Sequence, residues 1–291
     1  MWYNPEMDLL LTVVTATYNA VKAGRAETLE RCVRSVAALK VPHEHLVCDG
    51  GSTDGTVERL RRLERELAGV RVVSEPDRGI YDAFNKGWKA ARGAWICYLG
   101  DDDQVLHPEA LDAIVADATA DAAEWVVTPA ETPGHENWYV SPKNMRGLLI
   151  GTPYCHQGVL ARRTLLERLG GFDLSFPIAA DYDLFLRVHL AATAVRYDMR
   201  KFAWFSPAGL SSDTAAARKD LAAVQMKNLG LAPREAEVLA RRRLLPLRKV
   251  LPLVFHWGWE VRLAARHAVK RWLADRMGLL DAAGQPKGVF R

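Results

Sequence analysis

The sequence predicts an α/β protein in which helices cover both faces of a mostly parallel sheet. Short apolar runs alternate with amphipathic helical patterns, four such pairs precede residue 130, and a polar loop follows each apolar run. A chain of 291 residues is long enough for one large α/β domain with an appendage. Its composition, with 49% hydrophobic residues, 25% charged residues and a formal charge of +4, is typical of a globular protein.

The four strand and helix pairs follow one another in order. The first strand is LLLTVVTA (9–16), and the helix after it repeats apolar residues at helical spacing from Leu29 to Val36. The runs HLVCD, VRVVS and AWICYL are the next three strands, and a helical pattern follows each of them. Ligands of such sheets bind beyond the carboxyl ends of the strands. The loops that we expect around one cleft are 15–19, 49–53, 75–79 and 100–103.

The regular pattern fades after about residue 130 and returns near residue 155. There YCHQGVLARR predicts a strand, RTLLERLGG a short helix that ends at glycine, and DYDLFLRVHLAAT a longer helix. From about residue 211 strand signals disappear and basic helical segments take over. We therefore expect an α/β domain over residues 1–210 and a basic helical appendage over residues 211–291.

The cysteines and the N-terminus indicate a cytoplasmic protein. The first residues, MWYNPEMDLL, lack the basic start and the long apolar stretch of a signal peptide. No segment reaches the roughly 18 to 20 uninterrupted apolar residues of a spanning helix. The cysteines lack CxxC spacing, which predicts reduced core thiols and not a disulfide framework or a zinc site. They are Cys32, Cys48, Cys97 and Cys155.

The motif YLGDDD places three carboxylates, Asp101 to Asp103, directly behind an apolar strand. Like charges repel one another there, whereas Mg²⁺ and Mn²⁺ bind hard oxygen ligands and keep positions for substrate phosphates. One cation would offset the repulsion and hold a diphosphate. The alternative is an acidic loop that only caps the helix beginning at Pro108.

Three further motifs combine turn residues with polar groups. CDGGSTDGT (48–56) has two glycines that let the backbone approach a ligand, or that simply turn the chain from strand to helix. SEPDRGIYDAFNKGW (74–88) surrounds a helix start whose amides could meet phosphate oxygens, or it is a solvated amphipathic helix. FPIAADYDLFLR (176–187) puts Asp181 and Asp183 near a helix start, where an aspartate is either a general base or a cap.

Eight motifs occur in one order: VTATYNA, DGGSTDGT, EPDRGIYDAFNKG, YLGDDD, CHQGVLARR, GGFD, ADYDLFLR and AGLSS. Together they resemble the family 2 glycosyltransferases over roughly residues 8–212, with most likeness to the bacterial exopolysaccharide, O-antigen and colanic-acid-type enzymes. The resemblance implies a GT-A fold, a Rossmann-like mixed sheet, for the 1–210 domain. It also implies inverting transfer of a sugar from a nucleotide-diphosphate donor, UDP-sugar as the first choice, to a hydroxyl of a glycan or polyprenyl-diphosphate-linked acceptor in polysaccharide biosynthesis.

The resemblance assigns a donor site position by position. Gly100 stands where the family usually has the first aspartate of Asp-x-Asp-Asp, so Asp102 is the best ligand for Mn²⁺ or Mg²⁺, with Asp103 beside it. Asp49 would accept a hydrogen bond from the base, and Asp82 would border the ribose and the diphosphate. The residues implied for nucleotide-sugar binding are Thr17, Tyr18, Asp49, Asp82, Asn85, Lys86 and Asp101.

The resemblance also assigns the acceptor side. Asp181 matches the family's catalytic base, which would take the proton of the acceptor hydroxyl as its oxygen attacks the anomeric carbon. One displacement would invert the anomeric configuration. Ala180 stands where relatives often have glutamate, which leaves the acceptor's identity open. The residues implied around the acceptor pocket are His156, Gln157 and Asp173.

The C-terminal segment interleaves basic residues with Trp257, Trp259 and Trp272. This pattern suits an anionic membrane surface, such as the cytoplasmic face of the inner membrane, where a polyprenyl-linked acceptor would be found. The alternative is a basic helical cap on the catalytic domain or on a dimer partner, since Pro246 and Pro252 interrupt the pattern. Nucleic-acid binding is a weaker interpretation, because no nucleic-acid motif accompanies the charges.

Two other functions fit parts of the sequence. A sugar nucleotidyltransferase also uses acidic metal ligands on a doubly wound sheet, but it would need a glycine-rich basic loop after the first strand, and TATYNAVKAGRAET fits that poorly. A non-catalytic nucleotide-sugar-binding scaffold would be consistent with Gly100 and Ala180. The substitution Asp181→Asn separates an enzyme from a scaffold, because it should abolish transfer by an enzyme while preserving donor binding.

Overall fold

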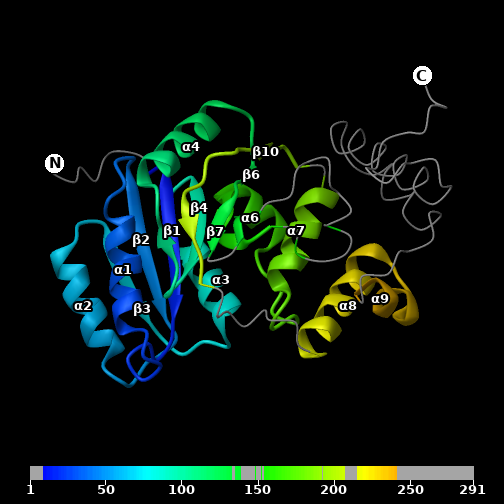
Figure 1. Ribbon diagram of the computed structural model, residues 1–291, viewed down its shortest axis with the longest axis horizontal. Coiled ribbons are helices and arrows are strands. Elements are labelled where there is room, and N and C mark those ends of the chain that lie inside the picture. The colour runs from blue at the N-terminus through cyan, green and yellow to red at the C-terminus, as the bar shows by residue number, and fades with distance from the viewer. Residues whose placement is uncertain are drawn as a thin grey trace.

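The computed structural model describes residues 9–132, 135–138, 148, 152, 154–191, 193–206 and 215–240. Within these residues the predicted α/β class is confirmed. A seven-stranded, mostly parallel sheet of order β10-β6-β9-β4-β1-β2-β3 carries helices on both faces (Figure 1).

The first half of the chain alternates strands and helices as the sequence predicts. In the register of the sheet Ala16 pairs with both Cys48 and Gly100, so β1, β2 and β4 finish at the same edge, and β3 pairs beside β2. The elements are β1 (Leu11–Thr17), α1 (Ala26–Val36), β2 (His43–Asp49), α2 (Thr56–Glu66), β3 (Val70–Ser74), α3 (Ile80–Ala90), β4 (Trp95–Gly100) and α4 (Pro108–Ala120).

The central strand β1 is buried along its whole length and contributes to the core on both faces of the sheet. Val14 packs with α3, whereas Leu11 and Val13 pack with α1 and α4. This alternation explains why the strand is a continuous apolar run. Gly87 lets α3 approach closely, because a Cβ at that position would lie 2.2 Å from Val14 Cγ1.

The strand β9 breaks the parallel order, since it lies between β4 and β6 and is antiparallel to both. The predicted strand YCHQGVLARR begins only at Val159, because the three residues before it form a 3₁₀ turn, η1. As β9 runs against β4, η1 lies at the edge where β4 ends. The remaining elements of this half are β6 (Trp125–Val127), η1 (His156–Gly158), β9 (Val159–Arg162), α6 (Arg163–Leu169), α7 (Ala180–Leu190) and β10 (Val195–Tyr197).

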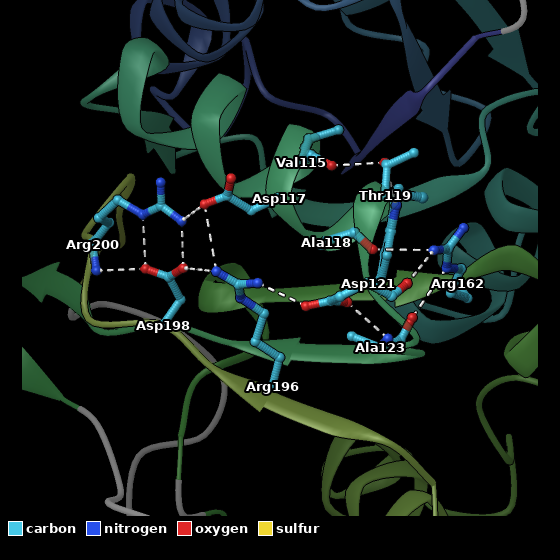
Figure 2. A network of polar contacts seen from close by, with 11 residues as sticks. Val115, Asp117, Ala118, Thr119, Asp121, Ala123, Arg162, Arg196, Asp198 and Arg200 are labelled. Carbon is cyan, nitrogen blue, oxygen red and sulfur yellow. Dashed lines mark hydrogen bonds and ion pairs between the residues drawn. The ribbon is translucent and has the colours of Figure 1, made fainter.

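A second sheet, of order β5-β11-β7-β8, is joined to the first through the chain segment after β10. Ion pairs fix the start of this segment on the end of α4: Asp198 accepts hydrogen bonds from Arg196 and Arg200, and both arginines also reach Asp117 (Figure 2). The hydrogen bonds from Arg200 lower the pKa of Asp198 to about 2, against the opposing effect of burial. The strands are β5 (Gln104–Val105), β7 (Ala130–Thr132), β8 (His135–Trp138) and β11 (Ala203–Trp204).

The last described helices are α8 (Ala215–Leu229) and α9 (Pro233–Ala240), and α8 packs on α7. Lys227 and Asn228 of α8 donate to Asp183 of α7 at 2.9 and 2.8 Å. The domain boundary at residue 210 stays a prediction, and the tryptophans and prolines of the C-terminal segment lie outside the described residues. None of the helices in the described part of the chain combines the length and the apolar character needed to cross a membrane.

Candidate active site

The loops after the parallel strands adjoin at the carboxyl edge of the sheet, as the sequence predicts. Thr17 Oγ1 donates a hydrogen bond to Asp101 Oδ2 at 2.7 Å, which joins the loops after β1 and β4. The backbone amide of Asn19 donates to Ser52 Oγ at 2.7 Å, which joins the loops after β1 and β2. These contacts bring polar groups from three strand ends together.

Asp101 is neutralised inside the protein by Arg25. The guanidinium donates from Nε to Asp101 Oδ1 at 2.8 Å and from Nη2 to Oδ2 at 3.2 Å, and the Asp101 side chain is only 7% exposed. The hydrogen bond to Asp101 raises the pKa of Arg25. Because Thr17 donates to the same carboxylate, Asp101 already has three internal hydrogen bonds before any donor sugar arrives.

Asp103 joins three segments of the chain. Its Oδ2 accepts hydrogen bonds from the Gly100 amide at 2.7 Å and from Gln157 Nε2 at 2.8 Å, and its Oδ1 accepts from the Ser206 amide at 3.1 Å. Burial raises the pKa of Asp103, and these hydrogen bonds oppose that rise. Asp103 therefore ties the acidic loop to η1 and to the segment after β11.

Asp102 differs from its two neighbours, because it is only partly buried whereas Asp101 and Asp103 are buried. Burial raises its pKa, the charges of Asp103 and Asp101 raise it further, and a hydrogen bond with Ser206 opposes both. The carboxylate repulsion foreseen from the sequence thus raises the pKa of Asp102, and the charge of Asp101 also raises that of Asp103. A bound cation would relieve this repulsion, and the available ligand atom is a hard carboxylate oxygen, which fits Mg²⁺ or Mn²⁺.

The acidic loop does not cap the following helix. The N-cap residue of α4 is His107, and no side chain caps it. The amides of Leu106 and His107 instead donate to the carbonyl oxygen of Phe202 at 2.7 and 3.2 Å. The alternative interpretation of YLGDDD, an acidic loop that only caps the helix beginning at Pro108, is therefore wrong.

Asp49 lies at the end of β2 and organises the loop that follows. Its Oδ2 accepts hydrogen bonds from the amides of Gly51 and Ser52 at 3.1 and 2.9 Å and from Ser74 Oγ at 2.7 Å, and Ser52 Oγ donates to its other oxygen. The residue is only 2% exposed. The expected hydrogen bond to a nucleotide base would have to be added to these four.

The start of α3 presents charged groups to the same edge. Asp82 Oδ2 accepts a hydrogen bond from the Arg78 amide at 3.0 Å and lies 3.9 Å from Lys86 Nζ. Lys86 also pairs with Glu75 at 3.1 Å, so its ammonium group stays near the loop after β3. The aromatic side chain of Tyr18 also lies at this edge and is 56% exposed to solvent.

Asn85 lies apart from these residues, on the buried side of α3. Its Nδ2 donates to the Phe172 carbonyl oxygen at 2.8 Å, while its Oδ1 accepts from the Phe172 amide at 2.9 Å and from Trp88 Nε1 at 3.0 Å. The side-chain amide therefore binds the turn that carries Gly171, where a Cβ would lie 2.5 Å from Asn85 Oδ1.

The expected base, Asp181, lies in the first turn of α7 beside His156 and Tyr81. Burial raises the pKa of Asp181, while the neighbouring His156 and the Tyr81 hydroxyl oppose the rise. Burial also lowers the pKa of His156. Its Nε2 is a buried polar atom for which the described residues provide no hydrogen-bond partner. A carboxylate and an unpaired imidazole nitrogen are suitable groups for a hydroxyl of a bound substrate.

The other acceptor-side residues are not gathered around Asp181. Gln157 binds Asp103, as described above. Asp173 binds Lys227 of α8 at 2.6 Å and the Ser175 amide at 2.9 Å. Although burial alone would raise the pKa of Asp173, these hydrogen bonds lower it to about 2. Asp173 thus fastens the turn before α7 to α8.

Sequence reasoning missed three residues that shape this site, namely Arg25, Tyr81 and Asp220. Arg25 and Asp101 are separated by 76 positions, and nothing local marks them as partners. Tyr81 resembles an ordinary apolar position of an amphipathic helix. Asp220 contacts α7 from a segment that the sequence separates from the α/β domain.

Known proteins resemble this chain in sequence. The profile described as "Glycosyl transferase family 2" matches residues 12–170, which is more than half of the chain. The "PGL/p-HBAD biosynthesis glycosyltransferase" of Mycobacterium bovis (strain BCG / Pasteur 1173P2) is 27% identical over 256 residues, covering 85% of this chain and 97% of the relative. The "Chondroitin synthase" of Pasteurella multocida (strain Pm70) is 28% identical over 186 residues, which is 62% of this chain and 19% of that enzyme.

Solved structures share the fold at low sequence identity. The S. aureus TarS fragment 1–349 in complex with UDP-GlcNAc aligns with a TM-score of 0.62 at 14% identity, covering 94% of this chain and 93% of that one. The mannosyltransferase PcManGT from Pyrobaculum calidifontis, in complex with GDP-Man and Mn²⁺, aligns with a TM-score of 0.57 at 21% identity, covering 96% of this chain and 79% of that one. The predicted GT-A fold is confirmed by these neighbours.

Proposed function

Because this chain belongs to glycosyl transferase family 2 and is a glycosyltransferase, we propose that it is a metal-dependent, inverting enzyme. It transfers a sugar from a nucleotide-diphosphate sugar, with a UDP-sugar as the first candidate, to a hydroxyl of a glycan or a lipid-linked acceptor. The product enters polysaccharide biosynthesis.

One observation carries this proposal: η1 lies between the two carboxylate groups that the reaction needs. Gln157 donates to Asp103 of the acidic loop at 2.8 Å, and the adjacent His156 lies against Asp181. Consecutive residues of one short turn therefore contact the proposed diphosphate side and the proposed acceptor side.

A divalent cation fits the acidic loop. In the part of the chain that the structure describes, no three His, Cys, Asp or Glu side chains are arranged to hold a metal by themselves. Asp102 and Asp103 are the residues that would hold the ion. When bound, Mn²⁺ or Mg²⁺ supplies positive charge that stabilises the departing diphosphate.

The chain's own residues perform the rest of the reaction. The ionised Asp181 takes the proton from the acceptor hydroxyl, and the acceptor oxygen forms a bond to the anomeric carbon from the face opposite the diphosphate. The bond between the anomeric carbon and the diphosphate oxygen breaks, and its electron pair leaves with the nucleotide diphosphate. Lys86 adds positive charge near the leaving group. The raised pKa of Asp181 makes it a better proton acceptor than an exposed aspartate.

Donor and acceptor identities are proposed at the level of class. One neighbouring structure holds UDP-GlcNAc and the other holds GDP-Man. These neighbours support a nucleotide sugar as the donor, but they do not favour one nucleotide base over another. The basic sequence 211–291 supports a lipid-linked acceptor at the cytoplasmic face of the inner membrane. Sedimentation of the full chain with anionic vesicles, compared with phosphatidylcholine vesicles, tests this location, which fails if neither kind of vesicle binds the protein.

A phosphate-binding role for the loop after β1, as in a sugar nucleotidyltransferase, is not favoured. Arg25 is a basic residue of that loop, and the structure defines its side-chain partners. Its guanidinium donates hydrogen bonds to Asp101 and to the Tyr18 carbonyl oxygen. The sugar transferase is therefore the function that the geometry supports best.

Calorimetric titration with UDP, GDP, CDP and dTDP, each with and without Mn²⁺, tests the donor side. Selective binding that needs Mn²⁺ and disappears in Asp102→Asn supports the proposal and identifies the nucleotide. Asp181→Asn should bind the same nucleotide and lose transfer. If no nucleotide binds, or if Asp181→Asn still transfers sugar, the proposed enzyme mechanism is wrong.

A further inference from the structure

We propose that Asp220 of α8 is a positioning residue that orients the base Asp181 by capping α7 from outside, an inference that rests on the function proposed above. Asp220 Oδ2 accepts hydrogen bonds from the backbone amides of Ile178 and Ala179 at 2.7 and 2.9 Å. Asp181 lies two residues after Ala179, in the first turn of α7. Helix α8 thus supplies a part of the framework around Asp181.

The start of α7 lacks a cap of its own. Its N-cap residue is Ala179, which has no side-chain acceptor and is only 5% exposed, and Ala180 after it is fully buried. The first amides of a helix have no partner within the helix, so an acceptor must come from elsewhere. The Asp220 carboxylate takes this role for the amide of the N-cap residue Ala179, across 41 positions of sequence, and it also binds the Ile178 amide just before it. An ionised acceptor also suits the positive end of the helix dipole.

The opposite side of the same peptide segment is held by α3. Tyr81 donates from its hydroxyl to the Ile178 carbonyl oxygen at 2.9 Å. The amide and the carbonyl of Ile178 are therefore fixed by two different helices, α8 and α3. Asp181 Oδ1 accepts a hydrogen bond from the Tyr182 amide at 2.7 Å, so the carboxylate is tied to the turn that this clamp holds.

Asp220 is itself held in place by the packing of α8. Val224 and Gln225, one turn further along α8, are fully buried. Beyond them Lys227 bridges Asp173 and Asp183 at 2.6 and 2.9 Å. Asp183 is completely buried, so this bridge fixes α8 firmly against α7. A shift of α8 would therefore move the cap, and with it the turn that carries Asp181.

Four variants of the full chain test the proposal, with UDP release from UDP-GlcNAc in Mn²⁺ and water as the acceptor, or release from whichever nucleotide sugar the titration selects. Asp220→Ala removes the acceptor, and Asp220→Glu keeps the charge but displaces it by one methylene. We expect both to lower kcat roughly 10- to 100-fold, because small displacements of a reacting group have effects of this size. Asp220→Asn keeps an acceptor oxygen and should stay within about threefold of the wild type. Lys219→Ala, an exposed neighbour on α8, is the matched control.

The pattern of losses distinguishes positioning from a merely structural role. We expect KM for the donor and the affinity for UDP to change less than about twofold in every Asp220 variant. Amide exchange of Ile178 and Ala179 should accelerate in Asp220→Ala and not in Lys219→Ala. If Asp220→Ala does not fold, the Glu and Asn variants carry the same comparison.

Two results would overturn the inference: unchanged kcat in both Asp220→Ala and Asp220→Glu, or equal losses of donor affinity and kcat. Asp181→Asn, measured alongside, separates this inference from the proposed function. If Asp181→Asn retains turnover, the base assignment itself is wrong. If Asp181→Asn is inactive while Asp220→Ala and Asp220→Glu are fully active, only the positioning role is wrong.

Discussion

Arg25 binds Asp101 through two hydrogen bonds, from Nε to Oδ1 at 2.8 Å and from Nη2 to Oδ2 at 3.2 Å. Paired contacts of this kind are among the stronger charge-assisted hydrogen bonds. The pair removes one of three adjacent negative charges from the acidic loop, and Asp103 directs both of its oxygens into the protein. Of the three carboxylates, Asp102 is thereby the one that stays partly exposed at this edge.

Removing Arg25 should destabilise the protein. In Arg25→Met the carboxylate of Asp101 stays buried beside two others, so we expect the free energy of unfolding to fall by about 1–3 kcal/mol. That range is below the cost for a fully buried pair, because the Arg25 side chain is 38% exposed. Urea unfolding at pH 7 measures the change. The second substitution Asp101→Asn should recover part of the loss. If the double-mutant cycle of Arg25→Met and Asp101→Asn shows no coupling energy, this interpretation is wrong.

Asp102→Asn should remove function without removing stability. A carboxylate whose pKa is raised in the folded state stabilises that state only at low pH, and this contribution is lost as the pH rises through the folded-state pKa. At pH 7 the variant should therefore melt at the same or a higher temperature than the wild type, while transfer drops roughly 100-fold or more. Glu109→Gln, whose carboxylate is 74% exposed, should change neither property. A clear loss of melting temperature in Asp102→Asn would show that the carboxylate has a structural role.

The acid side of the pH–rate profile should report Asp181. Its pKa is raised by burial, and the base must be ionised, so kcat should fall with a midpoint above the ordinary aspartate value of 3.8. Unfolding should not interfere there. Asp173 and Asp198 have pKa values of about 2, so their stabilisation is present above the unfolded-state pKa and is lost only as the pH falls from about 4 towards 2. Circular dichroism over the same range provides the control, and a midpoint at or below 3.8 would contradict the assignment.

Asn85 and Lys86 are adjacent residues, but we expect Asn85 to affect stability and Lys86 to affect nucleotide binding. Asn85→Ala leaves the Trp88 ring nitrogen and both backbone groups of Phe172 without their partner, so we expect a loss of about 2–4 kcal/mol in the free energy of unfolding. Lys86→Met should cost less than about 1 kcal/mol, because its partner Glu75 is 54% exposed and solvent weakens the pair. The substitution should also weaken nucleotide binding. Urea unfolding and calorimetry on both variants make the comparison. Weakened nucleotide binding in a stable Asn85→Ala would show that the amide contacts the donor.

The strands and helices up to residue 120 could be predicted because their signals are local. β1 is buried on both faces, so it is a continuous apolar run, and α1 buries its residues at the helical spacing seen in the sequence. The place of β9 could not be predicted, because an antiparallel strand between two others has no local signature. The extended start expected at His156 is replaced by a turn, since Gly158 packs so closely on Thr128 that a Cβ would lie 2.5 Å from its carbonyl oxygen.

In the candidate site, too, local features could be predicted from the sequence and contacts between distant residues could not. The motifs place carboxylates at strand and helix ends, and the structure puts Asp101, Asp102 and Asp103 at the carboxyl edge. How each charge is compensated depends on partners far along the chain, such as Arg25 for Asp101, and a single sequence carries no record of such pairs. The cap from Asp220 was missed for the same reason.

The closure between β6 and β9 has a consequence for the chain between these strands. The chain leaves the sheet at Thr128 and returns at Gly158, and these two residues are joined by a hydrogen bond from the Thr128 amide to the Gly158 carbonyl oxygen at 2.8 Å. A change in the length of the chain between these two residues would therefore leave the pairing of β6 with β9 intact.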